Sequence, residues 1–376
     1  MKTGPFPPRL ALSRTLLGGA LAVALSAAAN GCTEKFDPPS EVKTLRVFGA
    51  QAKPGSYAKP GTKVDLELLY FDASPKAIRA DGTRRPINIV WFGGCYNPSG
   101  DLYYGCFPVL AKALSALSPA AGQPPDLAKA AEFLGTGATF SINLPADIIS
   151  SRPPPSGSTI PYGVSYAFFA VCAGEVVQSQ GGDGGLPIRC QDPVTKQALG
   201  ADDFVFGYAS VYAYDELSNQ NPVIDGRTFQ GGPVDERPCT GDAACGAGFR
   251  CGTADVTRHC IPVVPHCTSA KLADCPKYKL DPVMDPAKNS ELDPNAKNAD
   301  GSVLQEVMWA YYFASDGTID KDTRLLNDAQ AGWQDPKKIG TEWQAPGDAS
   351  GETRIWGVYH DSRGGAAWTW WDVYVE

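Results

Sequence analysis

Short runs in which apolar and polar residues alternate recur along most of this chain, and this period of two constrains its fold more than any other feature. One run has apolar residues at every second position from Val64 to Tyr70, the pattern of a strand with one buried face. Alternating or apolar runs of strand length also lie at 45–50, 87–91, 138–144, 162–172, 204–214, 307–313, 353–360 and 366–375. The 40 glycines and 32 prolines supply turns between them. We therefore expect a mainly β protein.

The expected strands in residues 44–215 number six or seven, which is the range of an immunoglobulin-like β-sandwich. In such a domain Trp91 is expected to be a buried core residue. The segment of about residues 97–136 departs from strand spacing and is rich in alanine and leucine. A helix start at Pro125-Asp126 makes this segment a helical insertion in the first sandwich.

A second immunoglobulin-like sandwich is expected from two distant segments, residues 221–234 and residues 304–376. Its last two strands form a hairpin around residues 361–365. With Trp343-Gln344-Ala345-Pro346, they resemble the closing strands of PKD-like and related modules of bacterial surface proteins. Residues 235–280 are then a cysteine-rich insertion in the second sandwich, and residues 281–303 a polar, proline-containing linker.

The insertion holds six cysteines within about forty residues. Their spacing, with glycines and an acidic residue between them, is similar to small EGF-like or Dickkopf-like disulfide modules. Three bridges would compensate for a core that so short a piece is too small to build. A zinc site is the alternative, because His259 and His266 flank two of the cysteines, but no C-x-x-C pair occurs.

The amino terminus has the organisation of an export signal. Its first 14 residues include three basic residues, Lys2, Arg9 and Arg14, and no acidic residue. An uncharged run follows from Thr15 to Ala29. That run is shorter than the about 20 apolar residues that span a bilayer, so we expect residues 1–31 to be a signal peptide. Ala29-Asn30-Gly31-Cys32 resembles the bacterial lipobox, which implies lipidation of Cys32 and makes residues 32–43 a tether. The alternative is ordinary cleavage near Ala29, with Cys32 left to form a disulfide.

Assigning Cys32 to lipid leaves ten of the 11 cysteines, an even number that five disulfides would use. Disulfides imply an oxidising compartment outside the cytoplasm. The ten are Cys95, Cys106, Cys172, Cys190, Cys239, Cys245, Cys251, Cys260, Cys267 and Cys275. Proximity in sequence favours Cys95 with Cys106 and Cys172 with Cys190, although a bond between the sheets from Cys95 to Cys172 is an alternative.

Together these features predict an exported protein, lipid-anchored to a bacterial membrane at the outer membrane or cell surface. Several acyl chains, such as palmitate, on Cys32 would provide stable attachment to the membrane, since one chain binds only marginally. The formal charge is −8, and because the leader carries three positive charges and no acid, it is −11 without the leader. This excludes the basic surface that nucleic-acid binding needs and leaves a protein or glycan as the expected partner.

Catalytic motifs are absent from the sequence. It has three histidines and contains no G-x-S-x-G, H-E-x-x-H or P-loop motif. We therefore expect a structural or binding protein of the envelope, without enzymatic activity. An envelope hydrolase that uses His360 with nearby acids such as Asp361 is the alternative, because a catalytic triad is defined by geometry.

No resident cofactor is expected, apart from a candidate calcium ion. Asp316, Asp320 and Asp322 lie in one short loop, and Ca²⁺ binds carboxylate oxygens on flexible backbone. A calcium-dependent adhesion module is therefore a further alternative. The spacing differs from that of an EF-hand, and an acidic β-turn would have the same sequence.

The carboxy-terminal strands are unusually aromatic. Alternation places apolar rings on both faces of this hairpin, so an exposed stripe would form a binding platform for sugar or protein. Packing against the other sandwich or the cysteine-rich module is the competing interpretation. The candidate binding residues are Trp356, Trp368, Trp370, Trp371 and Tyr374.

Overall fold

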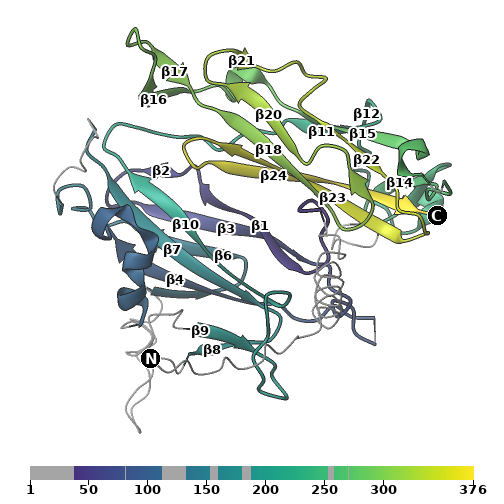
Figure 1. The fold of residues 1–376 in the computed structure, drawn as a ribbon, viewed down its shortest axis with the longest axis horizontal. Coiled ribbons are helices and arrows are strands. Elements are labelled where there is room, and N and C mark those ends of the chain that lie inside the picture. The colour runs from purple at the N-terminus through teal and green to yellow at the C-terminus, as the bar shows by residue number, and fades with distance from the viewer. Residues whose placement is uncertain are drawn as a thin grey trace, which may run out of the picture. The chain divides into compact units, whose positions relative to one another are not determined.

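The computed structural model describes residues 38–80, 82–111, 133–152, 160–179, 188–252, 258–269 and 271–376. This part of the chain is mainly β, with six sheets (Figure 1). Its helical residues lie in short 3-10 turns and at positions 107–111 and 133. The expected signal peptide and Cys32 lie outside the described residues. No helix within these ranges has the length and apolar character that crossing a bilayer requires.

Two sheets from the first half of the chain, here called the N-terminal sheet pair, share one core. One sheet has the order β1-β3-β6 and the other the order β2-β10-β7-β4-β5. The strands are β1 (Leu45–Lys53), β2 (Tyr57–Ala58), β3 (Lys63–Asp72), β4 (Asn88–Tyr96), β5 (Leu134–Thr136), β6 (Thr139–Asn143), β7 (Gly163–Cys172) and β10 (Phe204–Ala213). A separate hairpin pairs β8 (Glu175–Gln178) with β9 (Ile188–Gln191).

The period-two pattern explains how this pair packs. Val64 and Leu66 on β3 point inward and are buried with apolar residues of the other sheet. Trp91 on β4 is fully buried between Phe140 and Phe169. Its indole N–H donates to the backbone oxygen of Gly137 at 3.0 Å, which satisfies its polar group inside the core. The prediction of a buried core tryptophan is confirmed.

The outer face of the five-stranded sheet is covered as well. Phe168 on β7 packs there with Cys106 and Leu110, which belong to the segment after β4. Every residue of β7 is therefore buried. The segment carries the 3-10 turns η1 (Ser99–Asp101) and η2 (Tyr103–Cys106). Most of the expected helical insertion, residues 112–132, lies outside the described residues.

The second half of the chain contributes another two sheets with a common core, here called the C-terminal sheet pair. Their orders are β12-β11-β15-β22-β19 and β13-β14-β24-β23-β18-β20-β21. The core lies between them and includes Trp343, Tyr359 and Trp371. The strands are β11 (Gly226–Phe229), β12 (Gly232–Pro233), β13 (Phe249–Cys251), β14 (Cys260–Val264), β15 (Lys277–Val283), β18 (Met308–Ala314), β19 (Thr318–Ile319), β20 (Thr323–Asp328), β21 (Gly332–Trp333), β22 (Thr341–Gln344), β23 (Gly351–Asp361) and β24 (Ala366–Val375).

The expected boundaries of the cysteine-rich insertion and the linker differ from the structure. β15 covers residues 277–283 and so crosses the expected boundary between the insertion and the linker. It pairs with β11 on one side and with β22 on the other. Its alternate residues Tyr278 and Leu280 are buried in the core. β14, within the expected insertion, pairs in parallel with β24. The expected linker also contains β16 (Leu292–Lys297), which forms a hairpin with β17 (Val303–Gln305) at the linker's end.

All ten cysteines after Cys32 are paired. Cys95 bonds to Cys106 and Cys172 to Cys190, as proximity predicted. The other bonds are Cys239–Cys251, Cys245–Cys260 and Cys267–Cys275. Such bonds are typical of exported proteins.

The last residues of the expected tether are built into the fold. The backbone N–H of Val42 donates to the oxygen of Ala314 at 2.9 Å, and the N–H of Ala314 donates to the oxygen of Ser40 at 2.8 Å. Val42 is buried. Residues 40–42, here called the strap, therefore pair with β18 of the C-terminal sheet pair before the chain enters β1.

An aromatic cluster joins the two sheet pairs. Phe48 on β1 lies 4.7 Å from Trp356 on β23 and 4.9 Å from Phe313 on β18, measured between ring centroids. Phe71 on β3 lies 4.8 Å from the same tryptophan. Val42 of the strap and Val358 complete the buried part of the cluster. The two pairs thus bury apolar surface against each other, which favours their association.

Candidate binding groove

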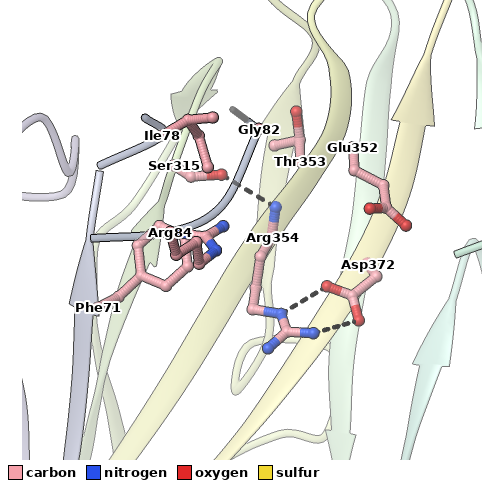
Figure 2. Close-up of a pocket in the computed structure, with 9 residues that line it drawn as sticks. All are labelled: Phe71, Ile78, Gly82, Arg84, Ser315, Glu352, Thr353, Arg354 and Asp372. Atoms are coloured by element: carbon pink, nitrogen blue, oxygen red, sulfur yellow. Dashed lines mark hydrogen bonds and ion pairs between the residues drawn. The ribbon is translucent and has the colours of Figure 1, made fainter. Parts of the chain in front are cut away.

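A groove of about 460 Å³ borders the aromatic cluster and takes residues from both sheet pairs (Figure 2). This volume is within the usual range for small-molecule sites. The residues that line it are Phe71, Ile78, Gly82, Arg84, Ser315, Glu352, Thr353, Arg354 and Asp372.

The C-terminal wall of the groove follows from the register of β23 and β24. Arg354 lies directly opposite Asp372, and Trp356 opposite Trp370. Because successive side chains of a strand point to opposite faces, these even-numbered residues share the face turned away from the core. The odd-numbered neighbours, such as Trp371, fill the core.

The guanidinium of Arg354 is fixed by two hydrogen bonds. Its Nε donates to Oδ1 of Asp372 at 2.6 Å and its Nη2 to Oδ2 at 2.9 Å. The backbone N–H of Arg354 donates to the hydroxyl of Ser315 at 3.0 Å. His259 approaches the same carboxylate at 3.5 Å. A bidentate pair of this kind has strong directional preference, so this wall is rigid.

The N-terminal wall is built on the end of β3. Arg84 is an exposed residue whose guanidinium lies 4.8 Å from the centre of the Phe71 ring. Its Nη1 also donates to the backbone oxygen of Asp72 at 3.3 Å. A cation held over an aromatic face is attracted by the ring quadrupole, which positions Arg84 at the rim.

The charges that line the groove balance. Two guanidinium groups, of Arg84 and Arg354, face two carboxylates, of Glu352 and Asp372. Figure 2 shows Arg84 and Glu352 on opposite sides of the groove, with the Arg354–Asp372 pair at its lower end. A site of this kind suits a polar ligand with little net charge. A ligand with a strong positive or negative charge would be repelled by the groups of the same sign in the groove.

The structure contradicts the exposed tryptophan platform. Trp356 and Trp371 are buried, and Trp368 and Trp370 pack against the aromatic cluster. Tyr374 is half-buried beneath the guanidinium of Arg250, 4.2 Å from its ring centre. The predicted platform does not form because the outer face of this hairpin contacts the N-terminal sheet pair, as the competing interpretation predicted.

The three candidate calcium ligands do not converge. Asp316 accepts a hydrogen bond from the backbone of Gly317, while Asp320 lies 3.7 Å from the ammonium of Lys277. Asp322 lies beside Thr323 at 3.4 Å. Among the described residues, no group of three carboxylates is close enough to share an ion. The acidic-turn interpretation fits this loop.

The residues of the alternative hydrolase site also point elsewhere. His360 stacks on Trp309 at 5.7 Å and contacts Tyr311, and its burial lowers the pKa of the imidazole. Asp361 turns to the other side, where its Oδ1 accepts hydrogen bonds from the backbone of Arg363 and Gly365. The carboxylate therefore closes the hairpin turn and does not orient the histidine.

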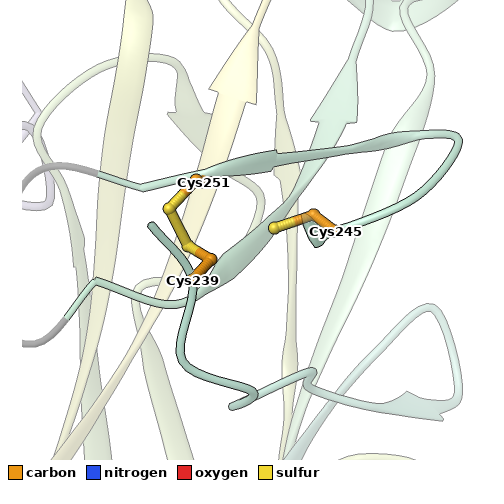
Figure 3. A group of neighbouring side chains, drawn as sticks. All are labelled: Cys239, Cys245 and Cys251. Atoms are coloured by element: carbon orange, nitrogen blue, oxygen red, sulfur yellow. A yellow bond between two sulfur atoms is a disulfide. The ribbon is translucent and has the colours of Figure 1, made fainter. Parts of the chain in front are cut away.

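The cysteines of the module are close together, but as disulfides. Sulfurs of Cys239, Cys245 and Cys251 lie within 4.8 Å of one another (Figure 3). Cys239 is bonded to Cys251, and Cys245 to Cys260. Zinc needs thiolates, so bonded sulfurs are not ligands. His266 instead contacts the backbone oxygen of Glu376 at 2.7 Å.

Sequence patterns did not single out the groove residues. The available signal was a charged residue inside an otherwise apolar strand, as with Asp372 in the aromatic run of β24. A nearly buried charge is normally paired, which predicts a partner but not its identity. Arg84 and Phe71 meet this face only through the contact between the sheet pairs.

No protein-family model matches this sequence, and no curated protein matches it.

Three solved structures align with most of the chain at low similarity. The fibronectin(III)-like modules of CbhA from Clostridium thermocellum share 9% identity, with 88% of this chain and 94% of theirs covered and a TM-score of 0.17. Trypsin-activated alpha-2-macroglobulin from Escherichia coli shares 8% identity, with 89% of this chain and 17% of that one covered and a TM-score of 0.19. Extracellular domains 3–5 of Drosophila OTK share 10% identity, with 90% and 98% covered and a TM-score of 0.14.

Proposed function

We propose that this chain is an exported, lipid-anchored binding protein of a bacterial envelope, without catalytic activity. It consists of two immunoglobulin-like sandwiches, the N-terminal and C-terminal sheet pairs, with a helical insertion in the first and a disulfide-rich insertion in the second. Lipid on Cys32 attaches it to the outer membrane or cell surface. The five disulfides support export, because bonds of this kind persist in oxidising compartments.

The observation that carries the binding role is the charge-balanced groove beside the aromatic cluster. Its wall is positioned in advance by the Arg354–Asp372 pair, so little ordering is needed when a ligand enters. Balanced charge favours a neutral or zwitterionic polar ligand, such as a sugar unit of an envelope glycan.

Saturation-transfer NMR on the full chain carrying Cys32→Ser tests this role. The probes are neutral sugars, zwitterionic amino acids, and singly charged anions and cations of similar size. We expect signals from the neutral or zwitterionic probes, and their loss in Arg84→Ala. Arg79→Ala is the matched control, because Arg79 is exposed in the same loop and does not line the groove. Equal signals in both variants, or binding only of simple ions, would contradict the assignment.

A further inference from the structure

A second cluster of charged residues joins the two sheet pairs, away from the groove, at the turn between β23 and β24. Arg363 in this turn is almost fully buried. Its Nε donates to Oε2 of Glu306 at 2.9 Å, its Nη1 donates to the backbone oxygen of Ser218 at 3.0 Å, and its Nη2 also donates to Glu291. Asp361 begins the same turn and is buried as well.

The turn is bonded directly to the N-terminal sheet pair. The hydroxyl of Ser56, between β1 and β2, donates to the backbone oxygen of Arg363 at 2.6 Å. The side-chain amide of Asn219 donates to Ser56 Oγ at 3.0 Å and to Oδ2 of Asp361 at 3.1 Å. Asn219 thus links Asp361 of the C-terminal sheet pair to Ser56 of the N-terminal sheet pair.

Glycines let the backbone pack closely around these bonds. A Cβ atom on Gly365 would lie 2.0 Å from Oδ2 of Asp361, and one on Gly55 would lie 1.9 Å from the backbone oxygen of Asn219. Gly364 has a φ of +91° and approaches Ser56, a conformation that glycine adopts without strain. The closed turn is therefore packed tightly against the segments that contain Ser56 and Asn219.

The charges of the cluster do not balance. One guanidinium, that of Arg363, faces the buried carboxylates of Glu306 and Asp361 and the partly exposed carboxylate of Glu291. The remaining groups that face it are Tyr57, whose ring lies 5.7 Å from the guanidinium carbon, and Asp293 and Tyr214 beside Tyr57. Burying an excess negative charge is costly unless a proton is taken up.

We propose that this cluster is an acid-tightened latch between the two sheet pairs: a proton held among its carboxylates closes the turn onto Ser56, and loss of the proton loosens it. Burial raises the pKa of Glu306 to about 7, against the opposing effect of Arg363. Burial also raises the pKa of Asp361. Both shifts have the same direction and the same cause.

The sign of the pH dependence follows from linkage. The closed latch binds the Glu306 proton more tightly than an open, hydrated one, whose carboxyl would titrate near 4.5. Closure is therefore most favourable below about pH 4.5 and becomes less so as the pH rises through about 7. Between these values opening releases a proton, so the opening constant rises up to about tenfold per pH unit.

Amide hydrogen exchange of the full chain between pH 5 and pH 8, divided by the intrinsic exchange rate at each pH, tests the latch. We expect protection of the Gly365 and Ala366 amides to fall up to about tenfold per pH unit toward pH 7 and then level off. Glu306→Gln, which cannot ionise, should remove this dependence. Glu236→Gln, at a well-exposed acid in an ion pair with Arg227, should keep it.

Three results would overturn the proposal. The first is protection of the turn that is independent of pH in the wild type. The second is an unchanged dependence in Glu306→Gln. The third is an equal fall at the amides of β7, because that would indicate loss of global stability and not a local opening. If Glu306→Gln fails to fold, the carboxyl ¹³C titration of wild-type Glu306 decides: a midpoint near 7 supports the latch and one near 4.5 refutes it.

Discussion

Arg354 and Asp372 face each other across β23 and β24 and form an ion pair with two hydrogen bonds. The Arg354 side chain is 14% exposed and that of Asp372 is 3% exposed. Removing one partner leaves the other charge buried without compensation. We expect Asp372→Ala to lower the free energy of unfolding by about 3 kcal/mol. The double variant Arg354→Met, Asp372→Leu should recover most of that loss, because apolar replacements of a buried pair are often neutral.

Denaturant unfolding measures both variants. Asp225→Ala is the control, since the Asp225–Lys288 pair is largely exposed and such pairs contribute less than about 1 kcal/mol. If the double variant is as unstable as Asp372→Ala, the ion pair makes a net contribution to the free energy of unfolding that apolar side chains do not replace.

The aromatic contact between the sheet pairs gives a second prediction. Phe48 is 8% exposed and packs on Trp356 and Phe313. Phe48→Ala should cost about 3 kcal/mol, since it leaves a cavity in the cluster. Hydrogen exchange should increase on β18 as well as on β1, because the two strands lose the same contact. An increase confined to β1 would mean that the sheet pairs are coupled mainly by other contacts.

A third prediction concerns acid stability. Burial opposes ionisation of Asp72, but hydrogen bonds from Arg85 and Ser74 lower the pKa of its carboxyl below the usual 3.8. Because the folded-state pKa is lower than the unfolded one, this stabilisation is present above about pH 4 and is lost as the pH falls through the folded-state value. Melting curves between pH 2 and pH 5 should show a smaller loss of melting temperature in Asp72→Asn than in the wild type. Parallel curves would rule out this role.

Membrane attachment gives a fourth prediction. Cys32→Ser should move the mature protein into the aqueous fraction without changing its melting temperature, because Cys32 precedes the strap and the sheets in the sequence. Cell fractionation followed by blotting checks this. Continued sedimentation of the variant with membranes would count against lipid on Cys32.

The disulfide module gives a fifth. Mass spectrometry of the alkylated, unreduced protein should find no free thiol among the ten cysteines after Cys32. Replacing Cys245 and Cys260 with serine should lower stability by about 2–4 kcal/mol, the usual contribution of one bridge. Free thiols in residues 239–275 together with bound zinc would support a zinc site in this module and contradict the disulfides.

Strand positions were predictable because a one-faced strand has a period of two. Val64 and Leu66 on β3 showed this pattern, and so did the aromatic run of β24. The sequence also identified Trp91 and the pairings Cys95–Cys106 and Cys172–Cys190. These predictions depend on local spacing alone.

What failed depends on contacts between distant segments. The tryptophans of β24 were candidates for a surface because alternation does not reveal whether a second face contacts water or another sheet. β15 was hidden because it follows directly after Cys275 and contains Pro282. The buried partners Asp72 and Asp203 of Arg85 lie 13 and 118 residues away from it, so no local pattern joins them.

If the protein is attached through Cys32 as proposed, the strap has a mechanical consequence. A pull on the tether reaches Pro39, whose backbone oxygen accepts a hydrogen bond from Arg46 on β1, and then Ser40 and Val42, which are bonded to Ala314 on the far sheet pair. The load is therefore shared between β1 and β18, which belong to different sheet pairs, and buried Val42 must leave its apolar site before β1 can be peeled away. Pulling from this end should meet resistance from both sheet pairs at once, so that the force acts on their junction and not on β1 alone.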